Sequence, residues 1–298
     1  MIAFGCVITE PEPYEHHAEP GIRLAAEPGS EVLTFGAVGP HGRGSNLVLE
    51  AAGRHDDLEA LVLVEPETRI ADPALCGKLR AAFADPEVAV VGCAGATGVR
   101  SLAWWEGSIV AGSVTHCYSE MGGGIIPAFS WAQTAPPPAE VDAVDGMLLA
   151  LSPWAVRNIR FDEALALGHG YDVDFCFEVR AQGRMVLVDD LTVVRHHPLK
   201  LVREREAWVE AHIQFARKWD GRIPGAPADD RTAKERARRN EAEHEAAHAV
   251  GRGHGLASEA QILEHERVIA KMTDTFSWRL TEPLRRLNRL RRPEEPAP

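Results

Sequence analysis

The segment Gly170-Tyr171-Asp172-Val173-Asp174-Phe175 decides the fold, together with Asp145-Gly146 before it and His196-His197-Pro198 after it. Acidic residues gather in this part of the chain where strand-like runs give way to helical patterns. The helix dipole alone favours acids in a first turn, so Asp172 and Asp174 also have a purely structural explanation. The stretch from Asp145 to His197 nevertheless carries the densest signal of possible chemistry in the chain.

Short apolar runs alternate with helical patterns in the first hundred residues, which is typical of βαβ units on a mainly parallel sheet. We expect strands over residues 3–8, 31–35, 61–64 and 88–91. We expect helices over 45–53, with Ser45 as N-cap, and over 72–83, opened by Asp72-Pro73. The pattern predicts an α/β fold with a Rossmann-like first half.

Residues 96–140 interrupt this rhythm, because Trp104-Trp105, a glycine run and a proline run predict long loops there. Beyond them we expect strands over 141–151 and 185–194, and helices over 153–159, 171–182 and 204–219. The predicted domains are an α/β domain over residues 1–220, a turn-rich linker over 221–228 and a helical extension over 229–298.

Several motifs occur in this sequence in the same order as in the nucleotide-sugar glycosyltransferases of the GT-A fold. The sequence resembles in particular the bacterial glycosyltransferase-like branch of family 2. These motifs are Asp145-Gly146, Phe161-Asp162-Glu163, the 171–175 segment, His196-His197, and a helix carrying Trp208 and Lys218-Trp219. The resemblance spans roughly residues 1–219, and Phe276 to Arg285 also resembles a motif at the ends of bacterial glycosyltransferases. It implies an inverting transfer of a sugar from a nucleoside-diphosphate donor to a hydroxyl acceptor.

Such a transfer needs a base for the acceptor proton and positive charge for the leaving diphosphate. The resemblance places Asp172 at the position of the catalytic base. It implies acceptor contacts from Trp104, Trp105, Asp145 and Gly146, and nucleotide-sugar contacts from Thr9, Glu10, Asn46 and Glu65.

The resemblance also implies a divalent metal, Mg²⁺ or Mn²⁺, after the strand at 61–64. Related enzymes carry an Asp-x-Asp motif there, whereas this sequence has Glu65-Pro66-Glu67. Glutamate remains a hard oxygen ligand, but it is one methylene longer, and Pro66 stiffens the loop. The implied ligands are Glu65, Glu67 and a histidine at His196 or His197. Tyr171 is a second departure, since many relatives have an acid beside the base.

A competing motif lies in the extension, where residues 244–254 read H-E-x-x-H-x-x-G-x-x-H. This pattern is typical of zinc proteases, with His244, His248 and His254 as ligands and Glu245 activating water. The stretch before it is charged and lacks the sheet that such a protease needs. The zinc protease and a non-catalytic module that binds sugar nucleotides or glycans stay open as alternatives.

The chain is acidic as a whole but basic near its C-terminal end. Lys and Arg total 32 against 44 Asp and Glu, and this net charge of −12 argues against nucleic-acid binding. The tail over 276–292 is instead basic and amphipathic, which is typical of segments on anionic membranes. With no apolar run of about 18 residues and no signal-peptide pattern, we expect a cytoplasmic protein at the inner membrane face, acting on a glycan or lipid-linked acceptor. The 5 cysteines read as buried apolar residues.

Overall fold

The computed structural model describes residues 1–36, 41–118, 129–131, 138–165, 169–197, 205–219 and 221–223, and the single residues 235, 238, 267 and 271. The chain divides into two compact units, Met1–Gly251 and Arg252–Pro298. All elements below lie in the first unit, and in the second Arg267 and Lys271 are helical. Linker residues 224–228, the zinc motif at 244–254 and the basic tail at 276–292 lie outside the described residues, so the predicted domain boundaries stay a prediction.

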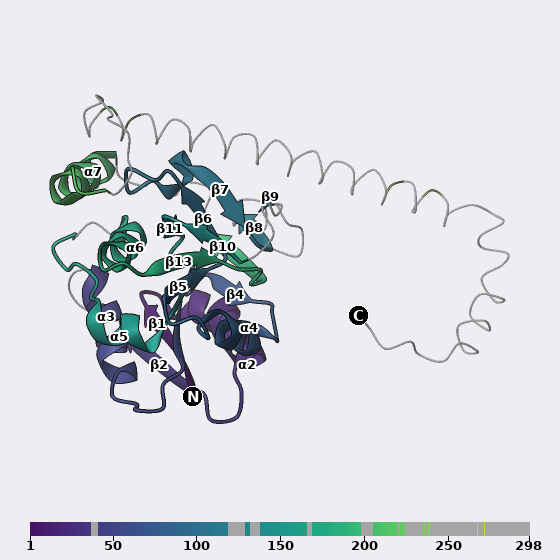
Figure 1. Ribbon diagram of the computed structural model, residues 1–298. Helices are drawn as coiled ribbons and strands as arrows, with labels where there is room; N and C mark the ends of the chain where they lie inside the picture. Colours follow the sequence, from purple (N-terminus) through teal and green to yellow (C-terminus); the bar gives the residue numbers. More distant parts are fainter. Residues whose placement is uncertain are drawn as a thin grey trace, which may run out of the picture. The chain divides into compact units, whose positions relative to one another are not determined.

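A seven-stranded sheet forms the centre of the first unit, in the order β10-β13-β5-β12-β3-β1-β2 (Figure 1). Its strands are β1 (Ile2–Ile8), β2 (Glu31–Gly36), β3 (Ala60–Val64), β5 (Val88–Gly92), β10 (Ala139–Val141), β12 (Leu148–Leu151) and β13 (Met185–Val188). All of them run in one direction except β12 and β10, which are antiparallel to their neighbours. The predicted α/β class with a mainly parallel sheet is confirmed.

Helices flank this sheet. They are α1 (Pro11–Pro13), the π-helix η1 (Tyr14–Ala18), α2 (Glu19–Ala25), α3 (His41–Ala52), α4 (Leu75–Ala82), the 3₁₀-helix η2 (Trp104–Glu106), α5 (Pro153–Asn158), α6 (Tyr171–Ala181) and α7 (Arg205–Trp219). Figure 1 shows α3 with α5 on one side of the sheet and α2 with α4 on the other. Buried apolar side chains fill the space between these layers, and all five cysteines are buried, as predicted.

Two smaller sheets correct the prediction of long loops over 96–140. One has the order β11-β6-β7 and the other β4-β14-β8-β9. Their strands are β4 (Thr68–Ile70), β6 (Ala94–Thr97), β7 (Ser108–Ala111), β8 (Val114–Tyr118), β9 (Phe129–Trp131), β11 (Ala143–Val144) and β14 (Val193–His197). Most of these pairings join residues far apart in the chain, which local sequence patterns do not reveal.

Two predicted long strands are divided between sheets. The run at 141–151 is split because β10 and β12 belong to the central sheet while β11 pairs with β6. The run at 185–194 breaks after Val188, and β14 begins again at Val193 in another sheet. Asp145-Gly146 therefore lies in a connection between strands, not inside one.

Two predicted helix starts are also wrong. Helix α3 begins at His41, so Ser45 is inside it, and Gly44 packs so tightly on β1 that an added Cβ would lie 2.7 Å from Val7. Helix α4 begins at Leu75, and Asp72 instead accepts a hydrogen bond from the Ala74 amide at 2.9 Å. The helices between residues 11 and 25 are not predicted at all. In contrast, α5 begins at Pro153 and α6 at Tyr171, as expected, and the structure shows that Ser152 caps α5.

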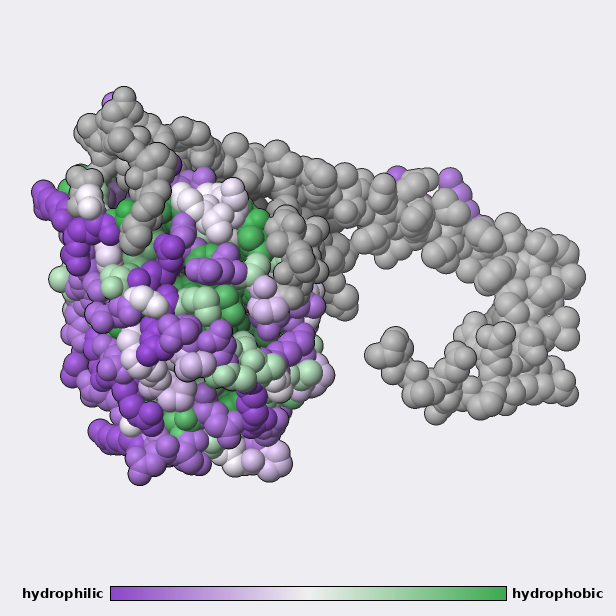
Figure 2. Space-filling view, in the orientation of Figure 1, coloured by the Kyte–Doolittle hydropathy of each residue, from purple (hydrophilic) through white to green (hydrophobic). Residues whose placement is uncertain are grey.

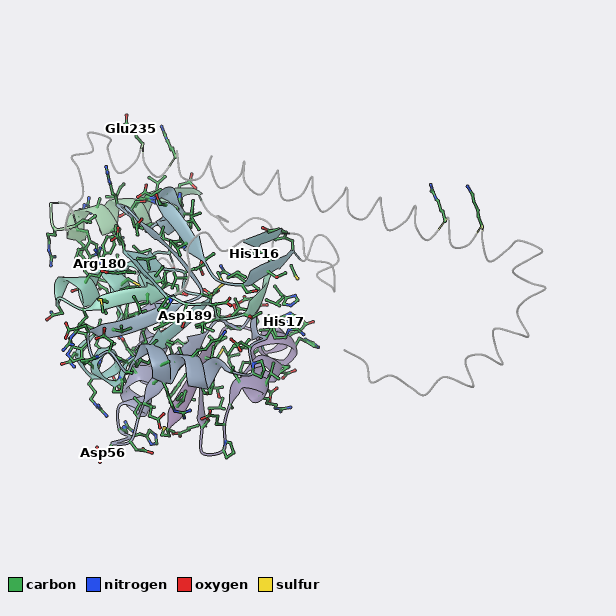
Figure 3. The ribbon with its side chains drawn as sticks, turned by 45° about the vertical axis from the view of Figure 1, so that its right-hand side comes forward. His17, Asp56, His116, Arg180, Asp189 and Glu235 are labelled. Carbon is green, nitrogen blue, oxygen red and sulfur yellow. The ribbon has the colours of Figure 1, made fainter. Side chains whose placement is uncertain are left out.

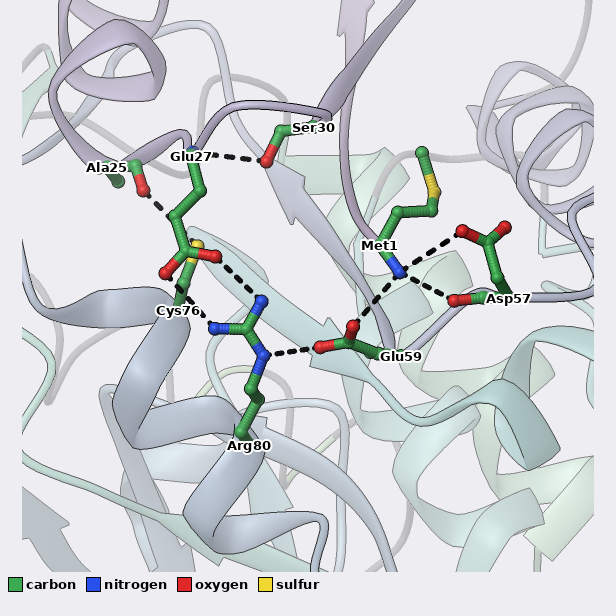
Figure 4. Close-up of polar contacts among 8 residues, drawn as sticks. All are labelled: Met1, Ala25, Glu27, Ser30, Asp57, Glu59, Cys76 and Arg80. Carbon is green, nitrogen blue, oxygen red and sulfur yellow. Dashed lines mark hydrogen bonds and ion pairs between the residues drawn. The ribbon is translucent and has the colours of Figure 1, made fainter.

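The amino edge of the sheet is closed by a network of surface ion pairs (Figure 4). Arg80 donates hydrogen bonds to Glu27 and Glu59, and the Met1 amino group contacts Glu59 and Asp57. These side chains are largely exposed, so each pair adds little to stability. On the face seen in Figure 2 the surface is mostly hydrophilic, with apolar residues in separate small patches.

Candidate functional site

Four chain segments bring acidic residues to the carboxyl edge of the central sheet. Thr9 and Glu10 are exposed and follow β1, and Glu65 to Glu67 follow the adjacent β3. Because β12 is antiparallel to β3, the residues that precede it lie at the same edge, and the Glu65 amide donates to the Met147 carbonyl at 3.1 Å. Ligands of open α/β sheets bind at this edge.

Asp145 is buried between η2, β12 and β14. Its carboxylate accepts hydrogen bonds from the Trp104 indole at 3.0 Å and from the Met147 amide at 2.8 Å. Arg195 lies 3.3 Å away and partly balances its charge. Burial is the stronger effect and raises the pKa of Asp145. Asp145 is thus a fixed, buried carboxyl group rather than a solvated loop acid.

Asp172 is held at the start of α6. Gly170 precedes it with a φ of +74°, and an added Cβ there would lie 2.4 Å from Leu102, so only glycine fits. The Asp172 carboxylate accepts from the Gly146 amide at 2.8 Å and from the Val173 amide at 2.9 Å. Burial, followed by the charge of Asp145, raises the pKa of Asp172 to about 7. A carboxyl group with a pKa near neutrality is matched to general base chemistry.

Glu65 is bonded through both carboxylate oxygens. It accepts from the Tyr171 hydroxyl at 2.7 Å and from Arg195 at 2.6 Å. Tyr171 reaches Glu65 across Gly146, where an added Cβ would lie 2.3 Å from the tyrosine hydroxyl. Sequence reasoning did not single out Arg195, although a charged residue in an otherwise apolar strand run beside a predicted site is a usable signal.

Glu67 and two histidines lie beside this cluster. No described side chain donates a hydrogen bond to the Glu67 carboxylate, and burial followed by the charge of Glu65 raises its pKa. The His196 amide donates to the Glu67 carbonyl at 2.8 Å, and the His196 ring stacks on His17 with centroids 3.9 Å apart. Burial, followed by nearby His196, lowers the pKa of His17 to about 4. The side chain of His197 lies outside the described part of the chain.

The residues fit a divalent metal only in part. Among the described residues, no three His, Cys, Asp or Glu side chains converge as a metal site. A Mg²⁺-type ion, however, is commonly held by one or two carboxylates and completed by substrate phosphates. Glu67 meets that requirement, whereas both oxygens of Glu65 are already bonded.

The predicted acceptor tryptophans have different environments. Trp104 is buried and bonded to Asp145, while Trp105 is half-buried and stacks on Trp208 of α7 with centroids 5.8 Å apart. His169 meets the edge of Trp208 at 5.1 Å. Asn46 is buried elsewhere, and its amide exchanges hydrogen bonds with the Phe161 backbone.

Asp174 is bonded to side chains of α7, unlike Asp172. It accepts from the Trp219 indole at 2.7 Å and pairs with Lys218 at 2.8 Å. Lys218 also contacts Asp162 and Glu178. The two acids of the 171–175 segment therefore differ. Asp172 lies beside Asp145 in the candidate site, whereas Asp174 connects α6 to α7 through its bonds with Lys218 and Trp219.

The protein is therefore an α/β protein that carries buried carboxyl groups at the carboxyl edge of a mainly parallel sheet. Residues 44–220 match the family model described as a glycosyltransferase-like family. Because the match covers more than half of the chain, the protein belongs to this family, and the resemblance inferred from the sequence motifs is confirmed.

One curated relative and two solved structures are similar to this chain. The streptomycin biosynthesis protein StrF of Streptomyces griseus is 30% identical over 200 residues, and the match covers 66%, just under two thirds, of each chain. The mannosyltransferase PcManGT of Pyrobaculum calidifontis, solved with GDP-Man and Mn²⁺, has a TM-score of 0.44 and 14% identity over 94% of this chain and 81% of its own. GalNAc-T7, solved with UDP, GalNAc and Mn²⁺, has a TM-score of 0.48 and 10% identity over 81% of this chain and 54% of its own.

Within the described part of the chain, no helix is both long enough and apolar enough to cross a bilayer.

Proposed function

We propose that this protein transfers a sugar from a nucleoside-diphosphate donor to an acceptor hydroxyl, with inversion at the anomeric carbon. The observation that carries the proposal is the buried Asp172 carboxyl beside Asp145 at the carboxyl edge of the sheet, in a chain of the glycosyltransferase-like family. The bonds from the Gly146 and Val173 amides fix the orientation of Asp172.

In the proposed reaction Asp172 takes the proton of the acceptor hydroxyl. The acceptor oxygen forms a bond to the anomeric carbon while the bond to the diphosphate oxygen breaks, and the diphosphate leaves with the electron pair. A Mg²⁺ or Mn²⁺ ion would supply positive charge to that leaving group, with Glu67 as the ligand that fits best. His196 stays a candidate for a second ligand, and so does His197.

We place the proposed substrate contacts along the carboxyl edge of the central sheet. Thr9 and Glu10 are exposed after β1, and we propose them as nucleotide-sugar contacts. Asn46 and Glu65 stay candidates from the resemblance, although their side chains are already hydrogen-bonded within the domain. On the acceptor side Trp105 is the more accessible tryptophan, and Trp104 acts through Asp145. We propose a glycan or a lipid-linked acceptor, and contact of the basic tail with an anionic membrane at its cytoplasmic face.

The test is release of nucleotide and transfer of sugar from UDP-glucose, UDP-N-acetylglucosamine and GDP-mannose, by the wild type and by Asp172→Asn. We expect Asp172→Asn to lower kcat by at least about 100-fold while nucleotide binding persists, because only the base is lost. Asp56→Asn is the control, since Asp56 is exposed at the end of the domain that holds the N-terminus, away from His17 (Figure 3). Nucleotide binding without any transfer would favour a non-catalytic binding module, and wild-type activity of Asp172→Asn would exclude the proposed base.

A further inference from the structure

Arg195 joins the two sides of the site. It lies on β14, and its side chain is only 13% exposed. Its guanidinium contacts Glu65 at 2.6 Å and Asp145 at 3.3 Å through two different nitrogen atoms. A planar guanidinium fixes the directions of both contacts at once, which a lysine ammonium does not do.

The two carboxylates held by Arg195 each hold a further part of the site. Glu65 accepts from the Tyr171 hydroxyl, and Tyr171 directly precedes Asp172. Asp145 accepts from the Trp104 indole and the Met147 amide. One cation therefore connects the end of β3, the start of α6, the residues before β12 and helix η2.

Burying an arginine is costly unless its charge and its hydrogen bonds are used. Here its charge lowers the pKa of Asp145 against the effect of burial. The remaining Nε atom is buried and has no hydrogen-bond partner among the described residues. Removing the guanidinium alone would leave the partly buried Glu65 and the buried Asp145 without their shared cation, so Arg195 fixes two acids of the site.

We propose that Arg195 is a positioning residue, whose fork-shaped contacts with Glu65 and Asp145 set the geometry and charge of the carboxyl pair Asp145 and Asp172. The inference rests on the proposed function for its catalytic consequence. Titratable groups facing the guanidinium or the pair are Glu65, Glu67, Cys93, Tyr118, Asp145, Tyr171 and Asp172.

The first test is a titration of the Asp carboxyl carbons by ¹³C NMR, in the wild type, Arg195→Met and Arg195→Lys, with signals assigned from Asp145→Asn and Asp172→Asn. Without the nearby cation the pair holds a proton more strongly, so its first protonation moves to higher pH by about one unit or more in Arg195→Met. Arg195→Lys keeps the charge and stays close to the wild type.

The second test is the kcat for nucleotide release from the same donor sugars. We expect Arg195→Met to lower kcat by about 100-fold and to move the acid limb of its pH profile upward, because small displacements of reacting groups are this costly. Arg195→Lys restores the position of the limb but only part of kcat, since the fork is absent. Arg180→Met is the matched control, because Arg180 forms an equally short ion pair with Asp142, at 2.7 Å, outside this cluster.

The outcomes separate the two proposals. An unchanged carboxyl titration in folded Arg195→Met overturns the role of Arg195, as does wild-type kcat in Arg195→Lys. Equal losses in Arg195→Met and Arg180→Met with unshifted pH limbs also overturn it, because they show general destabilisation. If the wild type acts on no donor sugar, the proposed function fails, and the titration alone, which needs no substrate, decides about Arg195. If Arg195→Met does not fold, Arg195→Gln replaces it in both measurements, because glutamine also removes the positive charge. An unchanged carboxyl titration in Arg195→Gln then overturns the role of Arg195.

Discussion

Two aspartates two residues apart behave differently because of what surrounds them. Among the described residues, the Asp172 carboxylate has only backbone N–H donors, and burial and nearby Asp145 raise its pKa to about 7. Asp174 is paired with Lys218 and the Trp219 indole. The sequence marks both as acids in a first helical turn, but it contains no local sign of which one faces the site.

The raised pKa of Asp172 makes stability depend on pH. Its folded-state pKa of about 7 exceeds the ordinary aspartate value of 3.8, so the folded state binds the proton more tightly. This group therefore favours folding progressively more as the pH falls from about 7 toward 4. We expect Asp172→Asn to raise Tm at pH 8 and to leave it nearly unchanged at pH 5. Thermal unfolding of both proteins at these pH values measures this, and an equal shift at both would contradict it.

His17 makes the opposite contribution. Its pKa is lowered to about 4 in the folded state from the ordinary histidine value of 6.5, so the unfolded chain binds the proton more tightly. Stability from this group is lost as the pH falls from 6.5 toward 4. Comparing Asp172→Asn with the wild type removes this background, because His17 is present in both.

At the scale of elements, α7 depends on its C-terminal attachment to α6. Asp174 is 1% exposed, and its removal leaves the Trp219 indole without its acceptor. Lys218 then keeps only the more exposed carboxylates of Asp162 and Glu178 as partners. We expect Asp174→Ala to cost about 3 kcal/mol in the free energy of unfolding, as for other broken buried ion pairs. Asp162→Ala is the control, because Asp162 is 29% exposed and its removal leaves Lys218 paired with Asp174. Urea unfolding of the two variants measures the difference, and equal costs would show that burial of the pair is unimportant.

Regular elements were predictable from sequence where local patterns determine them. The strands β1, β2, β3 and β5, the capped helix α5 and the helix α6 all follow from apolar runs and end signals. The sheet that contains β14 was not predictable, since it pairs Val193 with both Ile70 and Val114. That same pairing brings Arg195 to Glu65, so the residue that connects the site was missed for the same reason as the sheet.

At the scale of the whole molecule, the family and the α/β architecture were predictable because ordered motifs survive in the sequence. The segments that contain Asp145 and Glu65 come together because β12 lies between β3 and β5 and runs antiparallel to both. A sequence pattern of alternating strands and helices does not specify this position of β12. The expected catalytic, acceptor and donor roles remain predictions that the proposed kinetics address.

The basic tail gives a prediction about the full chain. The arginines at 279, 285, 286, 289, 291 and 292 would each gain about 1 kcal/mol near an anionic surface. We expect the full chain to sediment with phosphatidylglycerol vesicles at low salt and to be released from them at high salt. It should not bind phosphatidylcholine vesicles. Replacing these arginines with glutamine should abolish the binding. Binding that persists in this variant would contradict a role for the tail.

The central claim is a donor site at the carboxyl edge of the sheet, and calorimetric titration with UDP and GDP tests it most directly. The titration is done with and without Mn²⁺ on the wild type, on Glu67→Ala and on the surface control Glu87→Ala, since Glu87 is 59% exposed. We predict that one nucleotide binds the wild type and the control, that Mn²⁺ strengthens this binding, and that Glu67→Ala loses the Mn²⁺ effect. Absence of binding by either nucleotide, with or without Mn²⁺, would contradict the account.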